Sequence, residues 1–227
     1  MTVSSGLLIV FEGSEGAGKS TQLRMLAERL GAEGVDILPL REPGGTPLGD
    51  AIRSILLDPG QHISPSSEAL LFMASRAQIV REQIDPALAR GVVVLMDRFF
   101  LSTYAYQIFG RGLPEIEIRS ANALAAGGLV PSLTIVLEIP ATEGMERATA
   151  RGAHDRMEQS GDAFHDRVER AFTRFTDGDW QRAHPECGPI AGVDGRGTPD
   201  EVHARVLDAL ARNLPERFSM LSKERAS

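Results

Sequence analysis

The chain has 227 residues, of which 42% are hydrophobic and 24% are charged, so it can bury the core of one α/β domain or of two smaller ones. This composition excludes collagen-like, low-complexity and intrinsically disordered proteins. The 31 acidic side chains outnumber the 24 basic ones and leave a net charge of −7. Because such a molecule repels polyphosphate as a whole, we expect no nucleic-acid partner.

Neither end of the chain predicts a membrane partner or a secreted protein. The apolar run at residues 7–11 is much shorter than the roughly 20 residues of a membrane-spanning helix, and no basic segment precedes it. The one cysteine, Cys187, cannot form an intrachain disulfide, and we expect an inert side chain there. These features predict a cytoplasmic protein.

Apolar segments with strand character alternate with segments of helical spacing. The strand candidates, in chain order, are residues 7–11, 35–40, 92–96, 133–139 and 189–193. The first helical segment ends at Gly31, and the second ends before the turn at residues 58–60. The third begins at Ser64, and its spacing places Arg76 and Gln83 on one face.

This alternation predicts the fold class. Near-continuous strands of valine, isoleucine and leucine are typical of a parallel sheet that is covered on both faces, since parallel neighbours need crossover helices. We therefore expect an α/β fold with a five-stranded parallel sheet and helices on both faces, in a single domain that spans residues 1–227. Residues 214–227 are expected to fray.

A phosphate-binding motif follows the first predicted strand. Residues 13–21 satisfy the pattern G-x-x-x-x-G-K-[ST] and open a helix, as the motif requires. Glycines allow backbone N–H groups to surround an anion, Lys19 would reach the outer phosphates, and Ser20 would bind Mg²⁺. We assign a nucleoside triphosphate to Gly13, Ser14, Glu15, Gly16, Ala17, Gly18, Lys19, Ser20 and Thr21.

Two further pairs of residues point to the group that receives the phosphate. Phe72 and Arg76 are four residues apart on a predicted helix, so a ring that stacks on a base and donors that suit thymine O4 would face the same way. Asp97 and Arg98 end a predicted strand beside the loop, where Asp97 could manage Mg²⁺ and Arg98 a second phosphate. The alternatives are core packing for Phe72, a solvated charge for Arg76 and a strand-end salt bridge.

Four motifs in this order resemble those of the thymidylate kinases. They are residues 11–21 (Phe-Glu-Gly-Ser-Glu-Gly-Ala-Gly-Lys-Ser-Thr), 41–46 (Arg-Glu-Pro-Gly-Gly-Thr), 72–76 and 97–107. The resemblance implies a P-loop nucleoside monophosphate kinase-like fold, ATP and Mg²⁺ as cofactors, and transfer of the γ-phosphate of ATP to dTMP. It also implies a homodimer.

The resemblance implies roles for the residues at matching positions. Phe72 would stack on thymine, and the edge of the base would be read by Arg76, Thr103 and Gln107. The dTMP phosphate would be held by Arg98 and Arg53. The full set of expected substrate-binding residues is Glu15, Glu42, Arg53, Phe72, Arg76, Arg98, Ser102, Thr103, Tyr106 and Gln107.

Further roles concern the sugar and the metal. By resemblance, Tyr106 would exclude a ribose 2′-hydroxyl, and Glu15 would accept from the 3′-hydroxyl. Glu12, Glu42 and Asp97 would order Mg²⁺ and the phosphates, with the metal assigned to Ser20, Asp97 and Glu12. Structural roles remain equally open for Glu12 and Glu42.

We expect an arginine of a lid segment to supply the positive charge for catalysis. Some thymidylate kinases carry an arginine in the P-loop, but the matching residue here is Gly16. Residues 146–158 resemble the basic lid of the bacterial group that lacks this arginine, and we place the lid at about residues 143–162. The expected catalytic residues are Lys19, Asp97, Arg98 and the lid arginines Arg151 (first), Arg147 and Arg156. The alternative, for one or two of the lid arginines, is pairing along a solvated helix with Glu146, Asp155 and Glu158.

Other classes of P-loop protein predict other features. A GTPase would need a guanine-reading N-K-x-D segment, which the sequence lacks, and a nucleic-acid-stimulated ATPase would need a basic face. A kinase for another nucleoside monophosphate is the remaining alternative, and it would phosphorylate UMP, GMP or AMP in preference to dTMP.

Overall fold

The computed structural model describes residues 6–149 and 155–218. Within these ranges five parallel strands form a sheet of order β2-β3-β1-β4-β5. The strands are β1 (Leu7–Glu12), β2 (Ile37–Arg41), β3 (Val93–Asp97), β4 (Leu133–Glu138) and β5 (Ile190–Asp194). The α/β fold with a five-stranded parallel sheet, expected from the sequence, is confirmed.

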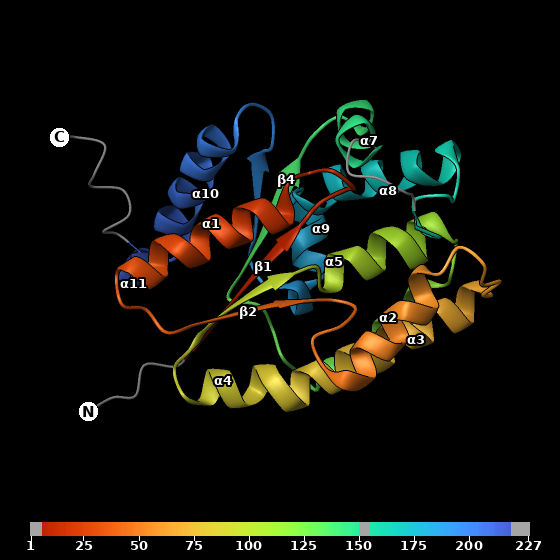
Figure 1. Ribbon diagram of the computed structural model, residues 1–227, viewed down its shortest axis with the longest axis horizontal. Helices are drawn as coiled ribbons and strands as arrows, with labels where there is room; N and C mark the ends of the chain where they lie inside the picture. The colour runs from red at the N-terminus through yellow and green to blue at the C-terminus, as the bar shows by residue number, and fades with distance from the viewer. Residues whose placement is uncertain (1–5, 150–154, 219–227) are drawn as a thin grey trace.

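Helices connect successive strands and cover both faces of the sheet (Figure 1). They are α1 (Lys19–Ala32), α2 (Pro47–Leu57), α3 (Pro65–Ile79), α4 (Asp85–Ala89), α5 (Phe100–Thr103), α6 (Glu115–Ala126), α7 (Ala141–Thr149), α8 (Asp162–Phe175), α9 (Gly178–Ala183), α10 (Pro199–Asn213) and α11 (Pro215–Phe218). Two π-helical segments, η1 (Val80–Ile84) and η2 (Tyr104–Gly110), and a 3₁₀ turn, η3 (Pro185–Cys187), complete the described chain.

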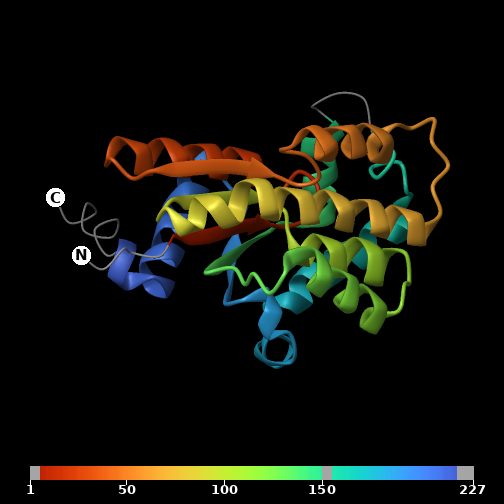
Figure 2. The same ribbon diagram turned by 90° about the horizontal axis from the view of Figure 1, so that it is seen from below.

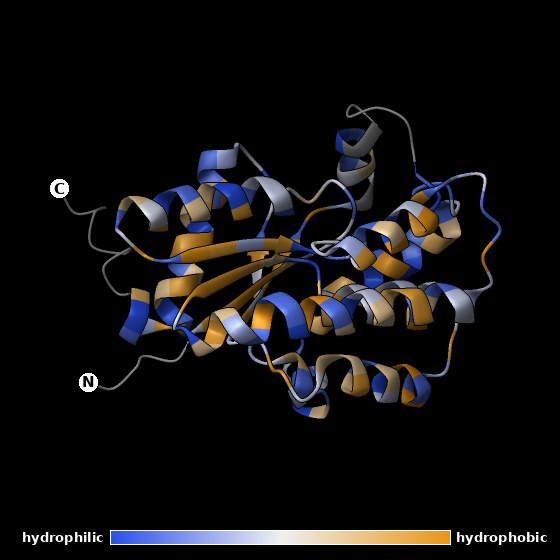
Figure 3. Ribbon diagram, turned by 60° about the horizontal axis from the view of Figure 1, so that its bottom comes forward, coloured by the Kyte–Doolittle hydropathy of each residue, from blue (hydrophilic) through white to orange (hydrophobic). Residues whose placement is uncertain are grey.

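Alternate side chains of each strand pack against opposite layers of helices. Ile9 and Phe11 of β1 join the core formed with α1, α10 and α11, whereas Leu8 and Val10 join the core formed with α3, α8 and the π-helical segments. Figure 3 shows the strands as hydrophobic along most of their length, while the helices carry hydrophilic residues on their outer faces. This pattern is the one expected of strands buried on both faces.

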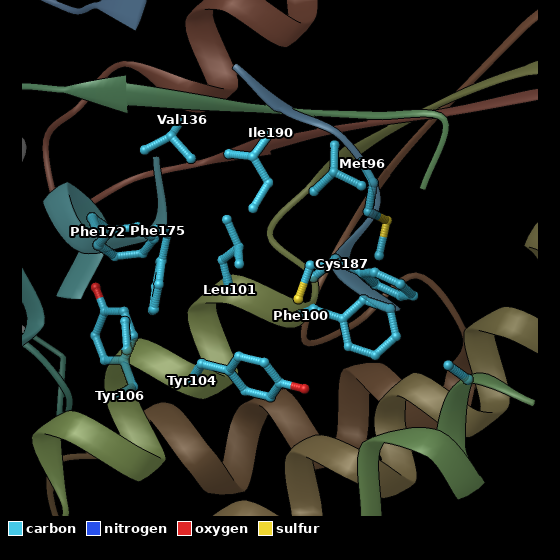
Figure 4. Close-up of a cluster of buried hydrophobic side chains, with 14 of the residues drawn as sticks. Met96, Phe100, Leu101, Tyr104, Tyr106, Val136, Phe172, Phe175, Cys187 and Ile190 are labelled. Carbon is cyan, nitrogen blue, oxygen red and sulfur yellow. The ribbon is translucent and has the colours of Figure 1, made fainter. Parts of the chain in front are cut away.

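An aromatic cluster fills the layer beneath the π-helical segment η2 (Figure 4). Tyr106 packs edge-on against Phe172, and Phe172 packs in the same way against Phe175. Cys187 is buried in this layer, and burial raises the pKa of its thiol, as expected for an inert cysteine. The cluster gives η2 a rigid support, so the residues that η2 presents to the other side are fixed in position.

The third predicted helix is longer and less regular than its spacing suggests. The segments α3, η1 and α4 form one rod across the sheet (Figure 2). The α-helical spacing ends at Ile79, so Gln83 does not continue the face that carries Arg76. Pro86 lies one turn further on and lacks an N–H donor, and the wider π-helical turn accommodates the missing hydrogen bond.

The carboxyl ends of the strands gather the functional residues. The strand arrows in Figure 1 point towards the edge at which α2, α5 and α7 lie. Asp97 at the end of β3 pairs in register with Phe11 of β1 and with Arg41 of β2. The loop after β1, the end of β3 and the segment after β2 therefore converge, as expected for ligand sites of open parallel sheets.

Two predictions about the ends of elements need correction. Val35 donates its N–H to the carbonyl of Leu30 and closes the end of α1, so β2 begins at Ile37. Fraying does not begin at residue 214, because residues 215–218 form α11 and Phe218 packs into the core. The rest of the tail lies outside the described residues. Within those residues no helix is both long and apolar enough to cross a membrane.

Candidate active site

The loop between β1 and α1 holds a lysine at its centre. Lys19 is the first residue of α1, and its Nζ donates hydrogen bonds to the carbonyl oxygens of Gly13 (3.0 Å) and Ser14 (2.7 Å). Burial lowers the pKa of Lys19 to about 8, and the nearby cation Arg98 adds to the effect. The ammonium group therefore lies in a place where a bound anion would stabilise its charge.

A hydroxyl and a carboxylate meet beside this loop. The Ser20 hydroxyl donates to Oδ2 of Asp97 at 2.5 Å, although the two residues are 77 positions apart. Hydroxyl and carboxylate oxygens are hard ligands of the kind that Mg²⁺ takes in proteins. The donor set thus fits the metal role predicted for Ser20 and Asp97.

Glu12 has a different environment from the one predicted. Its carboxylate is buried and accepts hydrogen bonds from the backbone N–H groups of Phe99 and Ser102 and from the Ser102 hydroxyl, at 2.7, 3.0 and 2.6 Å. Both oxygens thereby tie β1 to the start of α5. The structure favours the structural alternative for Glu12, because these hydrogen bonds occupy the carboxylate at the N-terminus of α5.

An arginine, a glutamate and a tyrosine are linked by hydrogen bonds beside the loop. Arg98 donates to Oε1 of Glu15 at 2.6 Å, and the Tyr106 hydroxyl donates to the same oxygen at 2.9 Å. Although burial opposes the charge of Arg98, the Glu15 carboxylate raises the pKa of Arg98 above its usual value. Burial raises the pKa of Tyr106, so its hydroxyl stays protonated. Arg98 also has φ 71°, a left-handed backbone that is rare outside glycine and that aims its side chain into the site.

One pocket collects all ten residues predicted to bind substrate. Its lining consists of Glu15, Glu42, Pro43, Arg53, Leu57, Phe72, Arg76, Arg98, Ser102, Thr103, Tyr106, Gln107, Asp155 and Met157. Four of these residues were not predicted, namely Pro43, Leu57, Asp155 and Met157. Pro43 lies in the motif at residues 41–46, and Asp155 and Met157 lie in the segment predicted as the lid. Leu57 reaches the pocket from the end of α2, and no local pattern marks it.

Arg76 lies at the base of the pocket with every N–H engaged. It is 1% exposed, and Glu42 accepts from Nε (2.9 Å) and Nη2 (2.6 Å). The remaining acceptors are Thr103 Oγ1 (3.0 Å), the carbonyl oxygen of Phe99 (2.8 Å) and Asn122 Oδ1. A guanidinium group has five N–H donors, so a further bond to a base would have to share or replace one of these.

Truncation of Arg76 is expected to destabilise the protein strongly, because it removes the partner of Glu42. Burial raises the pKa of Glu42 even though Arg76 opposes the shift. Arg76→Met leaves this carboxyl buried without its partner, and we expect a loss of about 3–5 kcal/mol in the free energy of unfolding. Arg24→Met is the matched control, since Arg24 and Glu28 form an exposed pair that contributes about 0–1 kcal/mol. Denaturant unfolding measures both, and equal losses would contradict the prediction.

The described arginines of the segment predicted as a lid are held by protein groups. Arg156 pairs with Glu68 at 2.7 Å and donates to the carbonyl oxygen of Leu56 at 2.7 Å. Arg147 pairs with Glu143 and donates to the carbonyl oxygen of Gly195 at 3.2 Å. Both arginines are therefore paired with carboxylates, although neither Glu143 nor Glu68 is among the acids that the sequence suggested as partners. Arg151 lies outside the described residues.

A second hollow lies on the other side of the loop. It is lined by Gly16, Ala17, Gly18, Thr21, Gln22, Arg147, Gly195, Gly197, Pro199 and Val202. A third, between this hollow and the substrate pocket, is lined by Glu15, Gly16, Gly18, Lys19, Ser20, Thr21, Arg41, Glu42, Arg53, Asp97, Arg98, Asp155 and Glu158. Seven of the nine predicted triphosphate residues thus line two adjoining hollows, whereas Gly13 and Ser14 line neither of them.

Sequence reasoning missed the carboxylate on which much of the pocket depends. Glu68 is fully buried on α3, four residues before Phe72 and eight before Arg76. It accepts from Gln107, Arg111 and Arg156. The i, i+4, i+8 spacing of Glu68, Phe72 and Arg76 was the available signal, because residues four apart share a helix face.

Comparison with known proteins relates this geometry to one family. The family model for thymidylate kinase matches residues 11–184. A thymidylate kinase from Pseudomonas fluorescens is 52% identical over 216 residues, which cover 94% of this chain and 98% of that protein. One from Deinococcus radiodurans is 44% identical over 209 residues, which cover 92% and 98%.

A solved structure supports the same relation. The crystal structure of thymidylate kinase from Ehrlichia chaffeensis superposes with a TM-score of 0.72 at 29% sequence identity, covering 91% of this chain and 99% of that one. The family model, the sequence relatives and the fold agree with the motifs that first suggested the resemblance. The chain belongs to the thymidylate kinase family.

Proposed function

We propose that this chain transfers the γ-phosphate of ATP to dTMP and releases dTDP and ADP. The observation that carries the proposal is that the hollow around the P-loop and the substrate pocket share the lining residues Glu15, Glu42, Arg53, Arg98 and Asp155. A phosphate held by Lys19 on one side would face a phosphate held by Arg98 and Arg53 on the other. Phosphoryl transfer needs this juxtaposition and positive charge more than covalent chemistry.

The substrate pocket supports the proposed recognition of dTMP. Phe72 would stack on thymine, while Thr103 and Gln107 would read its edge, with Arg76 behind them. Tyr106 would occupy the space that a ribose 2′-hydroxyl needs. Glu15 accepts from Arg98 and Tyr106, and its carboxylate would also accept from the 3′-hydroxyl of the sugar.

Mg²⁺ would be held by Ser20 and Asp97 together with the phosphates. When bound, the ion neutralises charge on the phosphates during transfer. The P-loop backbone would hold and orient the triphosphate. Lys19 would exchange the carbonyl oxygens of Gly13 and Ser14, which it contacts without nucleotide, for phosphate oxygens.

We further propose that the chain belongs to the group with a P-loop glycine and a basic lid, with the lid at about residues 143–162 of a single domain. Arg147 and Arg156 are both held by protein groups, so Arg151 remains the first candidate for the cation over the transferring phosphate. A closed lid would also exclude water and suppress hydrolysis of ATP.

Arg151→Ala is expected to lower kcat by about 10²-fold or more, with a modest change in the KM for dTMP. This pattern follows because a group that acts only in the transition state contributes to kcat and little to substrate binding. Arg182→Ala is the matched control, since Arg182 forms an exposed pair with Asp179 on α9. Unchanged turnover in Arg151→Ala would reject the assignment.

A coupled assay tests the reaction itself. Purified protein with ATP and Mg²⁺ is offered dTMP, dUMP, UMP, dCMP, AMP and GMP, with and without DNA. We expect the highest kcat/KM for dTMP and no stimulation by DNA. Preference for AMP, GMP or UMP would establish a different nucleoside monophosphate kinase, and ATP hydrolysis without an acceptor would establish a different class of P-loop protein.

We also propose a cytoplasmic homodimer with no membrane or nucleic-acid partner. The packed helices α3 and α6 carry large exposed apolar side chains, namely Leu70, Ile116 and Leu124. Exposed apolar side chains on neighbouring helices are typical of protein interfaces. Analytical ultracentrifugation decides the point, and a monomer at micromolar concentration would contradict it.

A further inference from the structure

Glu68 is a buried carboxylate that lies behind the substrate pocket and that the proposed mechanism does not use. It is 0% exposed on α3. Its Oε1 accepts from Gln107 Nε2 (2.9 Å) and Arg111 Nε (3.1 Å), and its Oε2 accepts from Arg111 Nη2 (3.0 Å) and Arg156 Nη1 (2.7 Å). A carboxylate with this set of partners is fully satisfied and fixed in place.

The charge on Glu68 determines what it can do to Gln107. Although burial opposes ionisation, hydrogen bonds from Arg111, Gln107 and Arg156 together hold the pKa of Glu68 below its usual value. An ionised carboxylate accepts hydrogen bonds and cannot donate them. Only the amide nitrogen of Gln107 can therefore face Glu68.

Because its nitrogen faces Glu68, the Gln107 amide has its carbonyl oxygen available to the pocket. Gln107 is 1% exposed and lines the substrate pocket, and within the described residues no group donates a hydrogen bond to its Oε1. Tyr104 and Tyr106 of η2 belong to the buried cluster (Figure 4), so the backbone that carries Gln107 is held in place. Gln107 thus offers the pocket an acceptor with a fixed orientation.

We propose that Glu68 is a positioning residue that makes the enzyme select thymine over cytosine by holding the Gln107 amide with its carbonyl oxygen towards the base. Thymine carries a hydrogen on N3 and can donate to this oxygen. Cytosine has an unprotonated N3, so its acceptor would face the acceptor of Gln107 and leave both without a partner. The inference rests on the proposed dTMP kinase function and identifies what sets the specificity of that site.

Glu68→Gln tests the proposal with little change in shape. The amide at position 68 would use its oxygen for Arg111 and Arg156 and turn its nitrogen to Gln107, which could then rotate and present its own nitrogen to the base. We expect the ratio of kcat/KM for dTMP to kcat/KM for dCMP to fall by about tenfold or more. Calorimetric dissociation constants for the two nucleotides give the same comparison where turnover of dCMP is slow.

Glu186→Gln is the matched control. Glu186 accepts from Tyr104 (2.8 Å) and pairs with Arg119 (2.9 Å), away from the residues that line the substrate pocket. It therefore tests whether loss of a partly buried carboxylate changes the ratio through stability alone. We expect an unchanged ratio in this variant.

A second variant decides the question if Glu68→Gln does not fold. Gln107→Met removes both ends of the amide while Glu68 keeps its arginine partners, and the ratio should again fall by about tenfold or more. An unchanged ratio in a folded Glu68→Gln or in Gln107→Met would overturn the inference while dTMP phosphorylation by the unaltered protein persists. Absence of dTMP phosphorylation in the unaltered protein would instead reject the proposed function.

Discussion

Lys19→Met is expected to lower kcat by at least about 10³-fold while the protein stays folded. The Nζ atom lies inside the P-loop against two carbonyl oxygens, in the place where the phosphates of ATP would bind. The variant removes a full charge from the transition state in a site where water screens little. Arg24→Met removes a cation from the exposed side of the same helix and should leave kcat unchanged.

The same lysine should oppose stability in the absence of nucleotide. Burial depresses its pKa from 10.5 to about 8, so between these values the unfolded chain binds more protons than the folded chain. Stability of the empty protein therefore rises with pH across this window, and below it the buried charge is a cost. We expect Lys19→Met to raise the Tm of the empty protein and to abolish this pH dependence.

ATP should reverse that effect because its phosphates stabilise the ammonium. Binding above pH 8 then takes up a proton, and the affinity for ATP falls as the pH rises further. Calorimetry in two buffers with different ionisation enthalpies measures the proton uptake. A wild-type enthalpy that is independent of buffer at pH 9, or a Lys19→Met variant with normal turnover, would contradict the role of Lys19.

The sequence was most informative where one local pattern carries both the fold and the chemistry. The P-loop motif needs a strand before it and a helix after it, so it located β1, α1 and Lys19 together. The four-residue spacing of Phe72 and Arg76 brought both to one pocket because α3 is regular over that turn. Local periodicity was therefore enough to predict which face of the helix carries Phe72 and Arg76.

Their partners depend on contacts that no local pattern encodes. Arg76 pairs with Glu42 across 34 positions, and Glu12 accepts from Phe99 across 87. Sequence spacing gives the direction of a side chain and leaves open which distant group meets it. For this reason neither the backbone partners of Glu12 nor the pairing of Arg156 could be predicted from the sequence, and the link through Glu68 was missed. The tertiary fold determines the partner of each buried charge, because a buried charge needs a partner and that partner can come from a distant part of the chain.

Gly16→Arg is expected to lower kcat/KM by about 10³-fold, although some family members carry an arginine at the matching position. Gly16 has φ 70°, and a Cβ at this position would collide with the carbonyl oxygen of Gly144 in α7. The contact is reciprocal, because a Cβ on Gly144 would lie 2.5 Å from the carbonyl oxygen of Glu15. The P-loop and α7, the first helix of the proposed lid, thus touch backbone to backbone.

An arginine at position 16 would have to push α7 or the P-loop aside before its guanidinium could reach a phosphate. Displacement of reacting groups by about 1 Å can already cost about 10²-fold in rate, and the collision demands a shift of that order in the loop that holds the phosphates. Gly34→Ala is the matched control, since Gly34 has φ 77° with no atom within 4 Å of a Cβ. It imposes the same kind of backbone strain without a collision and should leave kcat/KM unchanged. Full activity in Gly16→Arg would mean that α7 can move away freely, and the lid would then be independent of the P-loop.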